Sequence, residues 1–289
     1  DGKHGASDYL KEADTAVHEA KAHGRNCYRF FSNETKHVGE DSGTGWHGRL
    51  KEVLLKQQEI LYYQPLIGLH GQHENIHEFL LRLPDAAQKV ISPGAFMPAA
   101  ERFGLMAELD RGVIQKAAKL LSALQNPRMT LSINLSEQFF AREDIAEFLA
   151  ETLKNNAVTP SQFIFELSEL YIARNMEKLQ PVVAALTEQG FRFAIDDFGS
   201  GFSSFNYIKQ FPVHFLKIDS ALIEPVSTDN IARVTVRAIV EIAAEMHMRT
   251  IAKCVIDEES ITLLRTLGVD FAQGNFIAMP SPELKVSKQ

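Results

Sequence analysis

The chain has 289 residues, of which 45% are hydrophobic, a formal net charge of −7, and two cysteines, Cys27 and Cys254. This size accommodates one large or two modest globular domains with a full core, and the negative charge disfavours non-specific binding to polymeric DNA or RNA. Two distant cysteines support neither a disulfide framework nor a zinc cluster, and without an apolar run of about 18 residues no membrane span is expected. We therefore expect a cytoplasmic protein. Because the chain opens with Asp1 and carries no signal-peptide pattern, we expect it to be part of something longer.

Residues 1–33 predict one helix and one short strand, too little to form a core. Ala13, Val17 and Ala20 recur at helical spacing, and Gly24 is typical of a helix C-terminus. Residues 34–49 are polar and glycine-rich, which predicts a linker, part of which continues into a helix before the next strand.

Residues 50–285 predict an α/β domain in which short apolar strands alternate with capped amphipathic helices. Strands are expected at 60–69, 75–83, 129–135, 163–167, 191–197, 213–219, 248–253 and 269–274. Only five residues join the first two strands, which predicts a hairpin, whereas helices separate most of the others. The pattern favours a modified (β/α)8, TIM-like barrel with one antiparallel strand. An open doubly wound sheet is the alternative, although no glycine-rich phosphate loop opens a helix here.

Polar residues recur late in these strands or where the strands end, and one more, Glu78, lies inside the second strand. They are Glu78, Asn134, Glu166, Asp196, Asp197, Lys217, Asp219 and Gln273. In a βα barrel such ends converge on one face, where ligands bind. Each residue alone is explained as a helix cap or a solvated side chain. Together, closely packed carboxylates would repel one another, so their oxygens predict a site for Mg²⁺ or Mn²⁺.

The segment DDFGSGFSS, residues 196–204, follows one strand with two glycines. Gly199 and Gly201 permit backbone conformations closed to other residues, which is typical of a mobile functional loop as well as of a simple turn. Because the loop begins at the Asp196–Asp197 pair, we favour a functional role.

Ordered motifs across residues 50–283 resemble those of the EAL domain family, cyclic di-GMP phosphodiesterases and their inactive relatives. The motifs are YQP (63–65), EFLLR (78–82), NLS (134–136), ELSE (166–169), DDFGSGFSS, PVHFLKID (212–219) and QGNF with Pro280. Residues 1–33 are similar to the last helix and strand of a GGDEF domain. The GGDEF signature itself is absent, so no cyclase activity is expected.

The resemblance implies a barrel that binds cyclic di-GMP at one end with Mg²⁺ or Mn²⁺. It assigns Glu78, Asn134, Glu166 and Asp196 to a first metal, Asp197 to a second, and Lys217 to the attacking water. It places the following residues around the nucleotide: Gln64, Phe79, Leu80, Leu81, Arg82, Asn134, Asp197, Asp219, Gln273, Gly274, Phe276 and Pro280. Lys253 is not a family residue, and we expect its positive charge to attract the phosphates of the nucleotide.

The chain departs from the family at residues 252–256, where AKCVI stands in place of AEGVE. Lys253 and Ile256 replace two glutamates, and an ammonium at the first position disfavours a second metal ion. This favours a degenerate receptor that binds cyclic di-GMP without cutting it. The alternative is a slow Mg²⁺- or Mn²⁺-dependent phosphodiesterase that produces pGpG, because the set from Glu78 to Lys217 is intact.

EFLLR and QGNF are similar to FimX-type regulators of type IV pili, which act in twitching motility and biofilm formation. That resemblance implies a PilZ-domain protein as partner and leaves dimerisation open.

Overall fold

The computed structural model describes residues 44–72, 74–85, 89–199 and 208–284. The expected GGDEF-like segment, residues 1–33, lies outside the described residues, as does the expected linker up to residue 43. Helix α3, Thr44–Lys56, contains residues 44–49, so the last part of the expected linker is helical. The described chain divides into two units, one from residues up to Ile60 and Leu81–Leu109, the other from Leu61–Leu80 and Asp110 onward.

The first unit is a small layer of helices around its own apolar core. It holds α3, the end of β2, strand β3 (Val90–Ile91) and helix α4 (Pro93–Arg102). Ser92 precedes α4 and Pro93 is its first residue, as predicted, although the Ser92 side chain makes no capping hydrogen bond. The core contains Trp46, Leu50, Val53, Leu83, Phe96, Ala100, Met106 and Leu109.

The second unit is a closed barrel. Its strands are β1 (Ile60–Gly68), β2 (Asn75–Pro84), β4 (Met129–Asn134), β5 (Phe163–Ser168), β6 (Arg192–Phe198), β7 (Phe215–Ile218), β8 (Arg249–Ala252) and β9 (Phe271–Ala272). The order is β1-β9-β8-β7-β6-β5-β4-β2, and a pairing of β1 with β2 closes the ring. Strand β1 runs antiparallel to β9, whereas the ladders from β2 through β9 are parallel.

The predicted modified (β/α)8 barrel is therefore confirmed, and closure excludes the open sheet. All eight predicted strands are present. The sequence did not predict β3, which pairs antiparallel with the end of β2 outside the ring. Two residues carry too little periodicity to identify such a strand.

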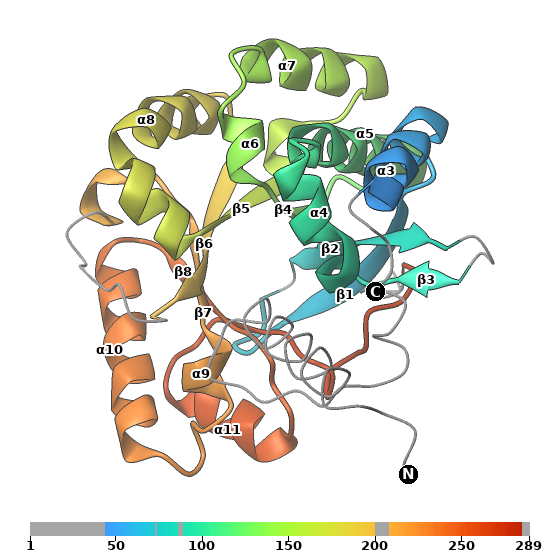
Figure 1. The fold of residues 1–289 in the computed structure, drawn as a ribbon. Coiled ribbons are helices and arrows are strands. Elements are labelled where there is room, and N and C mark those ends of the chain that lie inside the picture. The colour runs from blue at the N-terminus through green and yellow to red at the C-terminus, as the bar shows by residue number, and fades with distance from the viewer. Residues whose placement is uncertain (1–43, 73, 86–88, 200–207, 285–289) are drawn as a thin grey trace, which may run out of the picture. The chain divides into compact units, whose positions relative to one another are not determined.

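Helices cover the outside of the barrel strands (Figure 1). They are α5 (Met106–Leu124), α6 (Glu137–Phe140), α7 (Ile145–Asn156), α8 (Glu169–Glu188), α9 (Ser220–Ile223), α10 (Asn230–Glu245) and α11 (Glu258–Thr266). As predicted, α8 ends just before Gly190, which has a φ of +100°, and Asp257 caps α11 by accepting a hydrogen bond from the Ser260 N–H. No helix in the described part of the chain is long and apolar enough to cross a membrane.

Apolar side chains from seven strands fill the middle of the barrel, as expected for this fold. They are Leu66, Ile76, Ile164, Ala194, Phe215, Ile251 and Phe271. An ion group lies at the opposite end of the strands from the predicted site. There Glu74 accepts hydrogen bonds from Arg192 and Arg249, which are the first residues of β6 and β8. The Arg249 guanidinium also lies 4.5 Å from the Phe215 ring centroid.

Replacing Glu74 by Gln is expected to lower the free energy of unfolding by about 1–2 kcal/mol. Two guanidinium groups would lose their charged acceptor, and the effect is moderated because the Glu74 side chain is 37% exposed. Urea unfolding followed by circular dichroism measures it. Glu52→Gln, which breaks an exposed pair with Lys56 on α3, is the control and should leave the midpoint unchanged; equal effects of the two variants would contradict the prediction.

Candidate functional site

The polar residues predicted to converge lie together at one end of the second unit's barrel. We call this end the mouth. Glu78, Asn134, Glu166, Asp196 and Lys217 lie on β2, β4, β5, β6 and β7. Lys253 directly follows β8 and Gln273 directly follows β9. The parallel ladders place these positions side by side, since Glu78 is level with Ser132 and Asn134 is level with Glu166.

The buried centre of the mouth is an ammonium surrounded by carboxylates. Lys217 has no exposed surface, and its Nζ donates to Glu78 Oε2 at 3.0 Å and to Glu166 Oε2. Glu78 also accepts from Asn134 Nδ2 at 2.7 Å and from Gln273 Nε2 at 2.6 Å. The carboxylates are thus held by donors that come from three other strands or strand ends.

Charge pairing sets the protonation of this centre. Burial would lower the pKa of Lys217, but Glu166, Glu78 and Asp196 outweigh it and raise that pKa well above its ordinary value. Burial would likewise raise the pKa of Glu78, yet Lys217 leaves it lowered. For Glu166, burial and the nearby Glu78 prevail, and they raise its pKa to about 7. We infer that Lys217 stays charged and that Glu166 is the carboxyl most easily protonated.

A bulge in β6 brings two adjacent aspartates to the same place. Neighbouring residues of a regular strand point to opposite faces. The β6–β7 ladder, however, pairs Ile195 with Leu216 and Phe198 with Ile218, so β6 carries one extra residue, and Asp197 has a left-handed φ of +56°. Both Asp196 and Asp197 therefore reach one partner, the ammonium of Lys253.

Lys253 bridges this aspartate pair at close range. Its Nζ lies 2.7 Å from Asp196 Oδ1 and 2.6 Å from Asp197 Oδ1, and the Lys217 ammonium lies 4.0 Å from the same Asp196 oxygen. Burial would lower the pKa of Lys253, but Asp196 and Asp197 raise it above its ordinary range. Burial would raise the pKa of Asp196, but Lys217 and Lys253 lower it.

These contacts do not fit the pair of divalent ions implied by the sequence resemblance. The carboxylate oxygens are of the right kind for Mg²⁺ or Mn²⁺, yet ammonium groups already contact the oxygens that would face a metal. Within the described ranges no three His, Cys, Asp or Glu side chains are grouped so as to hold a metal ion.

The segment from Gln273 to Pro280 is an excursion between two contacts on β1. Continued without interruption, the ladder that pairs Ile67 with Ala272 would pair Tyr63 with Phe276. Tyr63 instead pairs with Ser281, five residues later, so the intervening residues leave the sheet. Gln273 and Gln64 remain hydrogen-bonded at 3.1 Å.

Side chains of this excursion supply an apolar rim next to the polar centre. Phe276 is 50% and Met279 70% exposed, while Pro280 is half-buried. Gly274 is buried where a side chain could not fit, because an added Cβ would lie 2.2 Å from the carbonyl oxygen of Val255. The excursion is thereby packed against the segment that follows Lys253.

The remaining predicted nucleotide contacts differ in exposure. Phe79 is 3% exposed, with its ring packed edge-on against Tyr63, and Leu80 is half-buried. Asp219 caps α9 by accepting from the Ala221 N–H at 2.8 Å. Leu81 and Arg82 belong to the first unit, where Arg82 Nη1 donates to the Leu81 carbonyl at 2.9 Å.

Two further residues of the site had no assigned role in the sequence. Ser132 is buried and its hydroxyl donates to Glu166 Oε1; its position two residues before Asn134, on the same face of β4, was the available signal. Glu169, 1% exposed, accepts from the Gly199 N–H at 3.0 Å and so connects the start of α8 to the end of β6. No local pattern identifies that contact.

The raised pKa of Glu166 predicts a pH-dependent stability. The folded state favours protonated Glu166, so this contribution is full below about pH 4.5 and is lost as the pH rises through about 7. Glu166→Gln should therefore gain stability relative to the parent chain between about pH 5 and about pH 8. Urea midpoints at both pH values test this, with Glu177→Gln on the exposed side of α8 as control. A difference that does not change with pH would contradict it.

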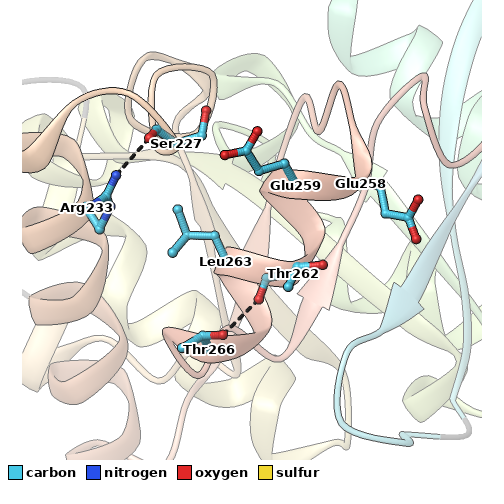
Figure 2. Close-up of a pocket in the computed structure, with 7 residues that line it drawn as sticks. All are labelled: Ser227, Arg233, Glu258, Glu259, Thr262, Leu263 and Thr266. Carbon is cyan, nitrogen blue, oxygen red and sulfur yellow. Dashed lines mark hydrogen bonds between the residues drawn. The ribbon is translucent and has the colours of Figure 1, made fainter.

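A separate pocket of about 630 Å³ lies between α10 and α11 (Figure 2). It is lined by Ser227, Arg233, Glu258, Glu259, Thr262, Leu263 and Thr266, none of which the sequence predicted as functional. Arg233 lies at the edge of this pocket, and its Nη2 donates a hydrogen bond to the Ser227 carbonyl at 2.8 Å. The predicted chemistry is therefore at the mouth and not in this pocket.

Comparison with known proteins identifies a matching family and several relatives. The EAL domain family matches residues 47–280. The cyclic di-GMP phosphodiesterase PdeB of Shewanella oneidensis is 33% identical over 284 residues, 96% of this chain and 33% of PdeB. The chain spans about a third of the length of such curated relatives.

Solved structures share the fold. The PaMucR phosphodiesterase, in complex with c-di-GMP, has a TM-score of 0.76 at 28% identity, covering 82% of this chain and 98% of the other. The Xanthomonas citri FimX EAL domain, also in complex with c-di-GMP, has a TM-score of 0.80 at 25% identity, covering 87% and 99%.

Proposed function

Because this chain belongs to the EAL domain family, we propose that its barrel binds cyclic di-GMP at the mouth and acts as a receptor that does not hydrolyse it. The proposed lack of hydrolysis rests on one observation, the contact of the Lys253 ammonium with both Asp196 and Asp197. Phosphodiester hydrolysis assisted by two metals needs both ions to stabilise the attacking and leaving oxygens.

Nucleotide binding is supported by the set of residues that the mouth retains. Lys253 supplies a positive charge for a phosphate, and the exposed ring of Phe276 supplies a flat apolar surface for a base. The related structures of PaMucR and the Xanthomonas citri FimX EAL domain contain c-di-GMP. A phosphate contact made equally before and during reaction gives affinity and no rate enhancement.

A second candidate function is slow hydrolysis of cyclic di-GMP to linear pGpG. The observation that favours it is the intact group of Glu78, Asn134, Glu166 and Lys217 at one place. Named phosphodiesterases such as PdeB are relatives, but this chain spans only a third of PdeB. Each transition-state contact missing from such a site costs roughly 10²–10³ in rate.

One pair of measurements separates the two functions. Calorimetry with cyclic di-GMP should show saturable binding, and chromatography after incubation with Mg²⁺ or Mn²⁺ should show no pGpG. Turnover within seconds would reject the receptor, and no binding would reject both functions. The double variant Lys253→Glu, Ile256→Glu should regain hydrolysis in the presence of Mn²⁺, whereas Ile256→Glu alone should stay inert.

A receptor needs a partner that responds to the bound nucleotide. We extend the proposal to a PilZ-domain protein, in line with the similarity of EFLLR and QGNF to FimX-type regulators of type IV pili. Size-exclusion chromatography with and without cyclic di-GMP tests this, and also tests for a dimer. A nucleotide-dependent shift in the presence of a PilZ-domain protein supports the extension, and co-migration that ignores the nucleotide argues against it.

A further inference from the structure

We propose that Lys253 is a tethered cation that takes the place of a divalent ion between Asp196 and Asp197, so that the mouth needs no metal to bind an anionic ligand. The claim that Lys253 replaces a metal ion rests on the contacts of Lys253 alone. The claim that the nucleotide binds without a metal rests on the proposed function.

The geometry around Lys253 is that of a cation site. The bulge in β6 turns two carboxylates toward one point, and the Lys253 Nζ occupies that point within 2.7 Å of both. A metal ion bound to the same two oxygens would lie roughly 2.0–2.6 Å from each. The ammonium and a metal ion therefore compete for one position.

Displacing the ammonium would be costly. The Lys253 side chain is only 20% exposed, so water would solvate its ammonium poorly if the ammonium left the two carboxylates. A divalent ion would also lie near the Lys217 ammonium, which is 4.0 Å from Asp196 Oδ1. Two positive charges that share one carboxylate in a partly buried site repel each other.

The charge balance explains how such a site can still attract a phosphate. A glutamate with a divalent ion has a net charge of about +1, and a lysine without an ion has the same net charge. Lys253 thus preserves the attraction for a phosphate while it removes the Lewis acid that would polarise a reacting bond.

The first test measures metal uptake without any nucleotide. Free Mn²⁺ is followed by electron paramagnetic resonance during titration of the parent chain, of Lys253→Glu and of Lys209→Glu. Lys209 is exposed on the 3-10 turn Ile208–Gln210, and its variant carries the same change of charge. Lys253→Glu should bind Mn²⁺ at least tenfold more tightly than the parent, and Lys209→Glu should match the parent. Adding Asp197→Asn to Lys253→Glu should abolish the gain.

The second test measures cyclic di-GMP affinity in EDTA and in Mn²⁺. The parent chain should bind equally, within twofold, in both. Lys253→Glu should lose at least tenfold in EDTA and recover in Mn²⁺. Lys253→Gln, which changes the local packing less, should lose affinity in EDTA and guards against a folding defect in the glutamate variant.

The outcomes decide the two claims separately. Equal Mn²⁺ affinity of the parent and Lys253→Glu, or a tenfold loss of the parent's nucleotide affinity in EDTA, would overturn the tethered cation. If no variant binds cyclic di-GMP, the proposed function fails, and the Mn²⁺ titration alone still decides whether Lys253 excludes the metal.

Discussion

Replacing Lys217 by methionine is expected to lower the free energy of unfolding by about 3–5 kcal/mol, because it removes the cation of a buried, hydrogen-bonded ion group. Lys217 has no exposed surface, and its ammonium contacts Glu78 and Glu166 and approaches Asp196. Methionine has a similar shape, so the loss reports the uncompensated carboxylates and not a cavity. Urea unfolding measures it, and the loss should grow as the pH rises, because removing Lys217 raises the pKa of Glu166 further and its carboxyl takes up a proton at lower pH.

Two controls isolate the buried charge. Lys178→Met, on an exposed position of α8, removes the same charge and should change little. The double variant Lys217→Met, Glu166→Gln should recover part of the lost stability, since one of the carboxylates facing the missing ammonium becomes neutral. A loss below about 1 kcal/mol for Lys217→Met that does not change as the pH rises would mean that water compensates these carboxylates, contrary to their burial.

Replacing Gly274 by alanine is expected to cost about 3 kcal/mol of stability, at the upper end of what overpacking usually costs. An added Cβ would lie 2.2 Å from the Val255 carbonyl oxygen and 2.3 Å from the Val255 nitrogen, and backbone atoms cannot turn aside as a side chain can. The two segments that meet there carry Lys253 and Phe276, so cyclic di-GMP affinity should also fall at least tenfold. Urea unfolding and calorimetry measure the two effects.

Gly48→Ala is the matched control for the added methyl group. Gly48 lies in α3, and an added Cβ would meet no atom within 4 Å. In an exposed helix, alanine should be neutral or stabilise by up to about 1 kcal/mol. If Gly274→Ala were tolerated as well as Gly48→Ala, the segments after β8 and β9 would have room to separate, and Gly274 would have no role in positioning Lys253.

Strand identity could be predicted because the barrel strands are short apolar runs bounded by polar turns. FIFEL and VHFLKID are examples: the first lies within β5, and the second contains the shorter strand β7. The convergence of Glu78, Glu166 and Lys217 followed from the same pattern, since parallel strands in a barrel bring their ends together.

What could not be predicted depends on contacts between distant segments. Regular alternation would separate Asp196 from Asp197, and only the ladder with β7 reveals the bulge that joins them. The hydrogen bond from Ser132 to Glu166 and that from Gly199 to Glu169 likewise depend on which strand lies beside which. The substitution of Lys253 was visible in the sequence, but its bridge between both aspartates was not.

The excursion of residues 273–280 is anchored at both ends on the same strand, Ala272 against Ile67 and Ser281 against Tyr63. Because the excursion lies outside the ladder, it can absorb an insertion or deletion while Tyr63 and Ser281 keep the two backbone hydrogen bonds that join them. The rim of the mouth can therefore diversify in length as well as in its side chains, while its two attachments to β1 stay fixed.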